Sequence, residues 1–379
     1  MHFAFNEEQE ELRRSARAFL REQSYSDAVR RAMESERGYD ESVWKQIGTQ
    51  LGWTAITIPE EYGGLGLTYI ELVALLEEMG AHLLCSPYFS TICLATNAVL
   101  RGTSETQKSE LLPAIAAGML TATLAYTEEN GRWDAGAIAA TARKDADGYR
   151  IDGVKTYVLD GHTADVLVIA ARREGSTAED GVSLFAVRGD APGVTRRLLP
   201  TMDQTRKQAE IRLEGVRVPA SALLTDEGAG WPILSSTLDL TAVALAAEQV
   251  GGAQRCLDMT VDYAKERIQF GRPIGSFQAI KHKCADMLLL VESARSASYY
   301  AGWAASVHAD DLPATASLAK AYCSDAYFRC AAEAIQIHGG VGFTWEYDVH
   351  LHFKRAKSTE TFLGDAARHR ELVACRIGL

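Results

Sequence analysis

The sequence predicts a mainly helical protein with one β domain in the middle of the chain. Helical periodicity of apolar residues marks both ends, and short strand-like runs lie between residues 121 and 224. A chain of 379 residues also exceeds the usual size of a single hydrophobic core. We therefore expect an all-helical domain over 1–120, a β domain over 121–228 and a second helical domain over 229–379.

The N-terminal domain is predicted to open with a capped helix. Asn6 is a favourable N-cap residue, and Gln9 stands at the reciprocal position of a capping box. Apolar residues recur with helical spacing over 41–52 and 70–79, and the Pro/Gly-rich stretch PEEYGGLG at 59–66 separates the two. These features predict helices joined by turns.

The middle domain is predicted to be a compact antiparallel sheet that ends near Leu224. Its runs are rich in Thr, Val, Ile and Tyr, and the Asp-Gly pairs at 147–148, 152–153 and 160–161 are typical turn signals. The expected strands are TATLAY, AAT, GYRIDGVKTYVL, ADVLVIAAR, VSLFAVRG, GVTRRLL and AEIRLEGVRV.

The C-terminal domain is predicted to consist of long helices. Apolar residues keep to one helical face over 238–257 and again over 280–291. Two further helices are expected over 314–337 and 361–376. The predicted order along the chain is therefore helices, then a sheet, then helices.

Composition and charge narrow the classes of partner. An apolar fraction of 47% with 23% charged residues is typical of a soluble globular protein. The formal charge of -11 argues against nucleic acid or an anionic membrane as a partner. No segment approaches the roughly 20 apolar residues of a spanning helix. The seven cysteines have no metal-ligand spacing, so we expect reduced core thiols and no metal. The N-terminus has the apolar spacing of a helix rather than the pattern of a signal peptide, so we expect a cytoplasmic protein.

The segment Arg267–Gln278 is suited to an anionic, aromatic ligand, because it holds cationic, amide, aromatic and glycine residues between two helices. Arg267 can offer a planar fork to pyrophosphate oxygens, Phe270 a ring face, and Gln278 a hydrogen bond to a sugar or phosphate. The alternative is that Arg267 and Arg272 cap a helix end and the glycines make a plain turn.

A second glycine-rich segment, QIHGGVGF at 336–343, also follows a helix. Its glycines would let a ligand approach backbone N–H groups, and the alternative is an ordinary glycine helix stop. Neither segment has the order GxGxxG after a strand, which excludes a Rossmann dinucleotide site.

Four motifs together resemble the acyl-CoA dehydrogenase family over essentially the whole chain. They are PEEYGGLG, GVKTYVLDGHTADVLVIAA, YAKERIQFGRPIGSFQAIKHKCADM and AIQIHGGVGFTWEYDVHLHFKRAK. The resemblance implies an N-terminal helical domain, a middle antiparallel β domain and a C-terminal four-helix bundle. It also implies FAD as cofactor, an acyl-CoA substrate, electron-transfer flavoprotein as electron acceptor, and assembly into a tetramer.

In that family each FAD lies at a dimer interface, where one subunit builds the isoalloxazine face and its neighbour holds the ADP half. The resemblance assigns the flavin side to Tyr126, Thr127 and Tyr157. It assigns the ADP side to Arg267, Gln269, Phe270, Gln278, Gln336, Gly339 and Gly340. The reaction removes an α-proton from the thioester with a carboxylate base and a hydride from the β-carbon with the flavin.

The sequence departs from the family on the catalytic side. The usual Glu base position falls on Leu363, and the alternative base position falls on Thr241, neither of which accepts a proton from substrate. In the flavin-facing loop Trp133 replaces the expected Ser, and Leu159 replaces a Thr that reaches the flavin edge. The ADP-side motifs, in contrast, are complete.

Three hypotheses follow. In the first, the chain resembles the non-basic partner in a heteromeric enzyme, such as the bacterial ones that act on steroid-CoA thioesters. In the second, it is an autonomous homotetramer with a relocated base, for which Glu248, two turns beyond Thr241, is the candidate against a plain ion-pairing role. In the third, it is a flavin-free scaffold, which the intact Arg267–Gln278 segment disfavours.

Four other titratable residues near these segments have simpler explanations. Glu360 is expected to face water and Asp365 to cap or pair locally. His338 and His369 are expected to be packed or hydrogen-bonded rather than to act as acid or base.

Overall fold

The structure, a computed structural model, describes residues 5–379 and separates into two compact units. The first unit consists of the residues up to Arg30, Tyr69–Leu84 and Ala242–Leu379, and the second consists of Arg31–Thr68 and Cys85–Thr241. The helices of the first 120 residues are therefore shared between both units. The linear division at residues 120 and 228 stays a prediction.

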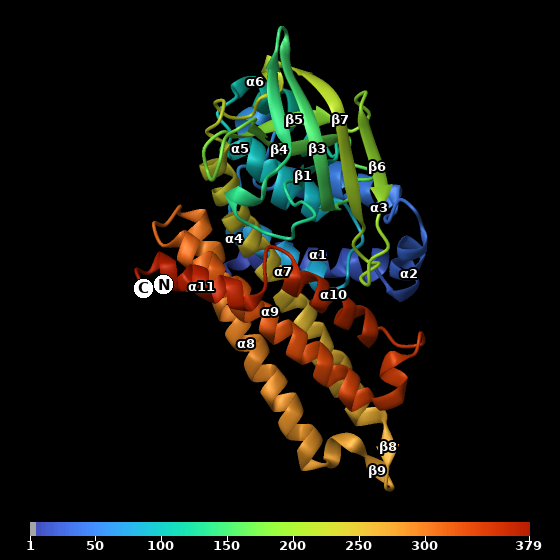
Figure 1. The fold of residues 1–379 in the computed structure, drawn as a ribbon. Helices are drawn as coiled ribbons and strands as arrows, with labels where there is room; N and C mark the ends of the chain where they lie inside the picture. The colour runs from blue at the N-terminus through green and yellow to red at the C-terminus, as the bar shows by residue number, and fades with distance from the viewer. Residues whose placement is uncertain (1–4) are drawn as a thin grey trace. The chain divides into compact units, whose positions relative to one another are not determined.

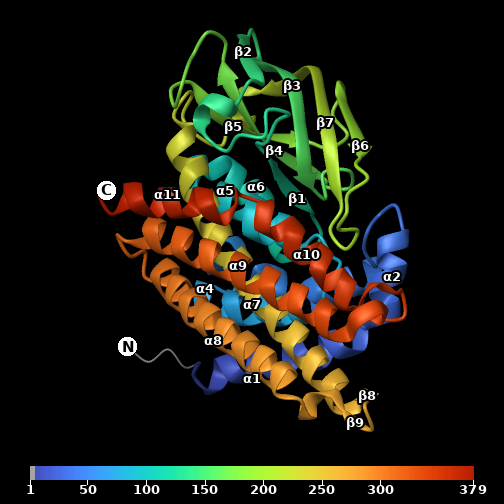
Figure 2. The same ribbon diagram turned by 60° about the horizontal axis from the view of Figure 1, so that its bottom comes forward.

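The first unit is helical, and α9 lies at its centre against α8, α10 and α11. Figure 2 shows α7, α8 and α9 running side by side in this unit. The helices are α1 (Glu7–Gln23), α4 (Tyr69–Ala81), α7 (Gly230–Glu266, which enters the unit at Ala242), α8 (Gln278–Ser306), α9 (Leu312–His338), α10 (Val349–Thr361) and α11 (Ala366–Arg376); α2 (Ser26–Glu34) crosses the division at Arg30.

Local sequence signals explain where these helices begin and how they pack. The capping box is confirmed, because Asn6 Oδ1 accepts from Gln9 N at 2.8 Å and Gln9 Oε1 accepts from Asn6 N at 2.9 Å. Buried apolar side chains from α7, α8 and α9 form one core cluster, which includes Cys256, Met287 and Ala331. Burial of these faces is the main source of helix stability here.

The helix expected over 361–376 corresponds to α11, which begins five residues later, at Ala366, and the preceding helix α10 was not predicted. The structure has α10 and α11 with a break between Thr361 and Ala366. Leu363 and Gly364 adopt left-handed backbone with φ of 67° and 98°, and Asp365 then caps α11 by accepting from Arg368 N at 2.8 Å. The sequence prediction placed residues 361–365 in a helix because their apolar spacing does not distinguish a helix from a loop.

The second unit contains a seven-stranded sheet in the order β1-β4-β2-β3-β7-β6, with β5 paired to β4 (Figure 1). The strands are β1 (Ala122–Ala125), β2 (Thr141–Asp145), β3 (Gly148–Leu159), β4 (Val166–Arg173), β5 (Val182–Arg188), β6 (Val194–Leu198) and β7 (Gln208–Pro219). Four of the pairings are antiparallel, as expected. The pairings of β4 with β1 and with β2 are parallel, which the sequence did not indicate.

The turn signals behaved differently from one another. The pair at 147–148 joins β2 to β3, and the pair at 160–161 follows β3. Asp152-Gly153, in contrast, lies inside β3 at an irregularity in its pairing with β7. A Cβ on Gly153 would lie 2.6 Å from the Cβ of Ala140, so glycine is needed there for close packing rather than for a turn.

Short helices complete the second unit. They are α3 (Glu41–Lys45), η1 (Gln46–Gln50), η2 (Trp53–Ala55), η3 (Glu60–Tyr62), η4 (Phe89–Thr96), α5 (Asn97–Arg101), α6 (Glu105–Ala116), η5 (Ala135–Ala137) and η6 (Ala220–Ala222). The PEEYGGLG segment turns sharply, and a Cβ on Gly64 would meet the carbonyl oxygen of Ile58 at 1.8 Å. Gly64 is therefore required by packing, whereas Gly63, with φ of 78° and no atom within 4 Å of an added Cβ, is favoured by its left-handed backbone.

Two expectations from composition need qualification. By length and hydropathy α7 is a candidate membrane span, contrary to expectation, but 72% of its apolar window is buried inside the protein, as in a core helix. The cysteines are free thiols and five are buried, whereas Cys284 is half-buried and Cys375 is exposed. Among residues 5–379 no cluster of His, Cys, Asp and Glu is suited to a metal ion.

Candidate functional site

The segment after α7 forms a small exposed hairpin. Arg267 follows the last residue of α7, and β8 (Ile268–Gln269) pairs with β9 (Arg272–Pro273). Phe270 at the turn has φ of 54° and is 91% exposed. A large aromatic ring held in solvent on a strained turn suggests that it contacts something outside this chain.

The second glycine-rich segment begins where α9 ends. Gly339 has φ of 66°, which favours glycine, and a Cβ on Gly339 or Gly340 would meet no atom within 4 Å. Packing within the chain therefore does not explain a glycine at position 340. The ring of Tyr263 stacks on His338 at 4.2 Å and its hydroxyl donates to the His338 carbonyl oxygen, which joins the base of this segment to that of the hairpin.

The polar side chains that the sequence assigned to the ADP side share one property. All are exposed and, within the chain from residue 5 onward, make no hydrogen bond or ion pair: Arg267, Gln269, Gln278 and Gln336. Arg272, in contrast, stacks on the ring of Phe277 at 4.1 Å. The unengaged guanidinium and amide groups fit the phosphates and ribose of an ADP group.

The flavin-side residues lie in the second unit and are mostly engaged. Tyr126 and Thr127 are buried, and the Thr127 hydroxyl donates to the Thr156 carbonyl oxygen at 2.5 Å. Tyr157 is 56% exposed with φ of 55°. The ring of Trp133 lies 6.0 Å from that of Tyr126, so an indole occupies the region where the family pattern has a small hydroxyl.

A buried ion pair that sequence reasoning missed fixes the loop after Thr127. The Glu128 carboxylate accepts from Lys155 Nζ at 2.6 Å and from the backbone N–H groups of Ala139 and Ala140. Burial lowers the pKa of Lys155, and the adjacent carboxylate opposes that shift. Only the spatial neighbourhood reveals this pair, because the two residues are far apart in sequence.

The position that the family resemblance predicts for the base holds a buried leucine. Leu363 is 5% exposed, and its carbonyl oxygen accepts from His369 Nε2 at 3.1 Å. His369 Nδ1 lies 3.3 Å from Ser317 Oγ, so this histidine is packed and hydrogen-bonded, as expected. Burial lowers its pKa to about 3, which keeps the ring neutral near pH 7.

A second missed residue, Lys320, anchors the same segment. It is fully buried, and its Nζ donates to the carbonyl oxygens of Glu360 and Gly364 and to Ser324 Oγ at 3.1, 3.2 and 2.8 Å. Burial lowers its pKa to about 7. The break that contains Leu363 is thus held from both sides by buried polar groups, and neither is a carboxylate.

The two other candidate base positions are occupied by structural contacts. The Thr241 hydroxyl lies 2.7 Å from the Cys93 carbonyl oxygen and 2.8 Å from that of Thr237. Glu248 is 4% exposed and accepts from Arg355, which is 1% exposed. The ion-pairing role considered for Glu248 is therefore the one observed.

The remaining titratable residues also take structural roles. Asp365 caps α11, and His338 Nδ1 donates to the Ala334 carbonyl oxygen at 2.7 Å. Glu360 is only partly exposed and pairs with Lys357 at 2.8 Å, so the expectation that it simply faces water is incomplete.

Comparison with known proteins identifies the family. Models of the acyl-CoA dehydrogenase N-terminal, middle and C-terminal domains match residues 6–119, 123–216 and 228–378. Acyl-CoA dehydrogenase IpdE2 of Mycolicibacterium smegmatis is 35% identical over 362 residues, which cover 95% of each chain. The chain belongs to the acyl-CoA dehydrogenase family. The resemblance inferred from the four motifs is confirmed.

Solved acyl-CoA dehydrogenase structures agree with the fold. Butyryl-CoA dehydrogenase from Megasphaera elsdenii matches with a TM-score of 0.93 at 28% identity over 100% of both chains. The ChsE4-ChsE5 complex from Mycobacterium tuberculosis matches with a TM-score of 0.89 at 28% identity, covering 100% of this chain and 99% of that chain. The expected fold class is confirmed. Members of this family of oxidoreductases use FAD.

Proposed function

We propose that this chain is one subunit of a heteromeric, FAD-dependent acyl-CoA dehydrogenase. In this proposal it binds the ADP half of an FAD whose isoalloxazine face and catalytic base belong to a related partner subunit. The observation that carries the proposal is a contrast within the chain. The ADP-side groups are exposed and unengaged, whereas the base position holds buried Leu363.

Glu248, the candidate for a relocated base, lies in a buried ion pair. Glu248 is already neutralised by the buried guanidinium of Arg355. Removing the Glu248 carboxylate from that pair would separate two buried, oppositely charged groups, at a cost of about 3–5 kcal/mol. The autonomous homotetramer with Glu248 as base is therefore the less favoured alternative.

Large apolar side chains around the two ADP-side segments support contact with another chain. Ile268 is 55% exposed, Phe343 70% and Trp345 59%, in addition to Phe270, and Leu289 on α8 is 69% exposed. Exposed apolar side chains gathered near polar groups are typical of protein interfaces. They favour a dimeric or tetrameric assembly, in which a flavin can lie between subunits.

FAD supplies the hydride acceptor for dehydrogenation of an acyl-CoA thioester. The contribution of this chain is to bind and orient. Arg267 can make two parallel N–H···O bonds to phosphate oxygens, Gln278 and Gln336 can hydrogen-bond the ribose or phosphates, and Gly340 permits close backbone approach. We further propose acyl-CoA as substrate, electron-transfer flavoprotein as electron acceptor, and a cytoplasmic location.

Expression of the chain alone and together with a companion acyl-CoA dehydrogenase chain that carries a Glu at the base position tests the proposal. We expect flavin absorbance and acyl-CoA oxidation from the co-expressed complex, and neither from the isolated chain. A flavin-loaded homotetramer that oxidises acyl-CoA unaided would refute the heteromer. Absence of flavin in every assembly would instead leave the scaffold hypothesis.

A further inference from the structure

Two adjoining pockets lie among the helices of the first unit, away from the ADP-side segments in sequence. Their volumes are about 280 and 250 Å³. Both are lined by Arg21 at the end of α1, His82 just after α4 and Arg255 on α7. The larger one also includes His352 on α10. We call the surface formed by Arg21, His82, Arg255 and His352 the basic pocket.

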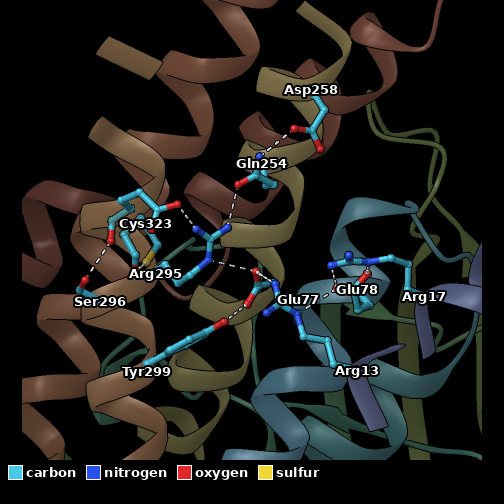
Figure 3. Close-up of polar contacts among 12 residues, drawn as sticks. Arg13, Arg17, Glu77, Glu78, Gln254, Asp258, Arg295, Ser296, Tyr299 and Cys323 are labelled. Carbon is cyan, nitrogen blue, oxygen red and sulfur yellow. Dashed lines mark hydrogen bonds and ion pairs between the residues drawn. The ribbon is translucent and has the colours of Figure 1, made fainter. Parts of the chain in front are cut away.

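The two carboxylates of α4 that line the smaller pocket, Glu77 and Glu78, are already ion-paired. Figure 3 shows Glu77 and Glu78 of α4 surrounded by arginines from α1 and α8. Arg13 bonds both carboxylates, and Arg17 bonds Glu78 at 2.6 Å. Arg295 bonds Glu77 at 3.2 Å. This network leaves no carboxylate of α4 for the basic pocket and holds α1, α4 and α8 together.

The acidic residues nearest the basic pocket are also engaged. Asp348 is the one carboxylate among the described residues that line the larger pocket, and it accepts from Arg30 and from Ser26 at 2.6 and 2.7 Å. Asp258, on the wall of the smaller pocket, accepts from Gln254 at 2.8 Å. Neither carboxylate pairs with Arg21 or Arg255.

Arg21 and Arg255 therefore differ from the other arginines of these pockets. Over residues 5–379 neither makes a hydrogen bond or an ion pair, whereas Arg13, Arg17 and Arg295 each make several. Burial lowers the pKa of His82; Glu78 opposes this shift, and the charges of Arg255 and Arg21 add to it, so both arginines lie near the ring. The basic pocket is a concave surface with a local excess of positive charge, which attracts anions.

We infer that the basic pocket binds the phosphate group of a small molecule between Arg21 and Arg255. Guanidinium groups bind phosphate with paired, charge-assisted hydrogen bonds, and two of them from different helices can grip it from two sides. His82 Nδ1 is committed to the Glu78 carbonyl oxygen at 2.9 Å, so Nε2 is its atom for the ligand. The ion-pair network of Figure 3 holds the helices that carry this site in position.

Isothermal titration of the FAD-loaded complex of this full-length chain with its co-expressed partner, using inorganic phosphate and pyrophosphate, tests this site. We expect saturable binding that weakens by on the order of tenfold or more in Arg21→Gln and in Arg255→Gln, since each removes a charge-assisted contact. Arg14→Gln is the matched control. Arg14 lies on α1 with its side chain 62% exposed and pairs with Glu11 at the surface, so its loss should leave phosphate binding unchanged.

Three results would overturn the inference. One is the absence of saturable phosphate binding, and another is equal binding by the wild type and both pocket variants. The third is that Arg21→Gln or Arg255→Gln reduces the oligomer mass in solution while phosphate binding stays intact. That outcome would assign the arginines to a carboxylate of a neighbouring subunit. Thermal unfolding midpoints close to that of the wild type confirm that the variants are folded.

Discussion

At the scale of single residues, the side chains that hold the segment around Leu363 in place are indicated neither by the family motifs nor by helical periodicity. Lys320 lies 43 residues before Leu363 in the sequence, roughly two helices away. His369 lies six residues after Leu363, or about two helical turns. Both are buried, and both bond carbonyl oxygens of the break between α10 and α11. The leucine at the predicted base position could be identified from the sequence, whereas Lys320 and His369 could not be linked to it.

The lowered pKa of Lys320 predicts a specific pH dependence of stability. Its value in the folded protein is about 7, below the ordinary value of 10.5, so the unfolded chain binds more protons between these two values. The free energy of unfolding should therefore rise with pH in that window, by up to about 1.4 kcal/mol per pH unit from this residue. Lys320→Met should remove this rise in thermal unfolding between pH 7.5 and 9.5.

The control for Lys320 is Lys265→Met, because the side chain of Lys265 is 71% exposed and does not lose hydration on folding. It should show the same pH profile as the wild type. Parallel profiles for the wild type and Lys320→Met would contradict an ammonium group that is costly to bury.

The buried Glu248–Arg355 pair predicts that Glu248 contributes to stability rather than to catalysis. Glu248→Gln keeps the shape of the side chain but removes a buried negative charge beside Arg355, so we expect a loss of about 3–5 kcal/mol in the free energy of unfolding. The double variant Glu248→Gln/Arg355→Met should be less destabilised than the single one. Both are measured by chemical denaturation.

Flavin bleaching by substrate distinguishes the two roles of Glu248. In the folded fraction of a co-expressed Glu248→Gln complex, bleaching should persist under the proposed function. Complete loss of bleaching, with the flavin still bound and the protein folded, would establish Glu248 as the base.

At the scale of elements, most helices and strands follow from periodicity and turn chemistry. β3 coincides with the expected run GYRIDGVKTYVL, and α4 and α9 lie within a few residues of their expected ranges. The failures have physical causes. The parallel pairing of β1 and β2 with β4 is a long-range choice, and the break at Leu363 depends on Lys320 and Asp365 rather than on local apolar spacing.

The hairpin after α7 predicts that substitutions of its two arginines differ in their effect on FAD binding. Arg267→Gln should weaken FAD binding by roughly tenfold or more, because it removes a charge-assisted contact to phosphate. Arg272→Gln, in the same hairpin, should have little effect on FAD, since Arg272 stacks on Phe277. Fluorescence titration of the apo-complex with FAD measures both. Equal losses would contradict the assigned roles.

Two glycines predict opposite effects of an added methyl group. Gly64→Ala should lower the thermal unfolding midpoint, because its Cβ would lie 1.8 Å from the Ile58 carbonyl oxygen. Gly340→Ala should leave the midpoint of the apoprotein unchanged, since its Cβ has open space, but should weaken FAD binding. Unaltered FAD binding in Gly340→Ala would remove this glycine from the proposed site.

At the scale of the whole molecule, the family and the three-part order of the chain were predictable, because several motifs spread over the sequence agree. The division into compact units was harder to predict from the sequence. The helices α1 and α4 are distant in sequence from the C-terminal helices but belong to the same unit as α8 to α11. The basic pocket arises from this arrangement. Arg21 and Arg255 are on helices that no sequence motif connects.

The proposed assembly predicts that a substitution in this chain weakens binding of a flavin whose catalytic base belongs to the partner subunit. In a purified heteromer, Arg267→Gln in this chain should lower the flavin content although the partner is unaltered. The corresponding change in the partner should have a smaller effect if its own ADP-side segment is incomplete. Flavin-to-protein ratios from absorbance give the answer, and a ratio that depends only on the partner would exclude the shared site.

The exposed rings of Phe270, Phe343 and Trp345 have a consequence for production of the protein in the cell. A chain made in excess of its partner has no surface on which to bury them, and apolar patches of this kind promote aggregation and degradation. Under the proposed heteromer, matched synthesis of the two chains should therefore raise the yield of folded protein.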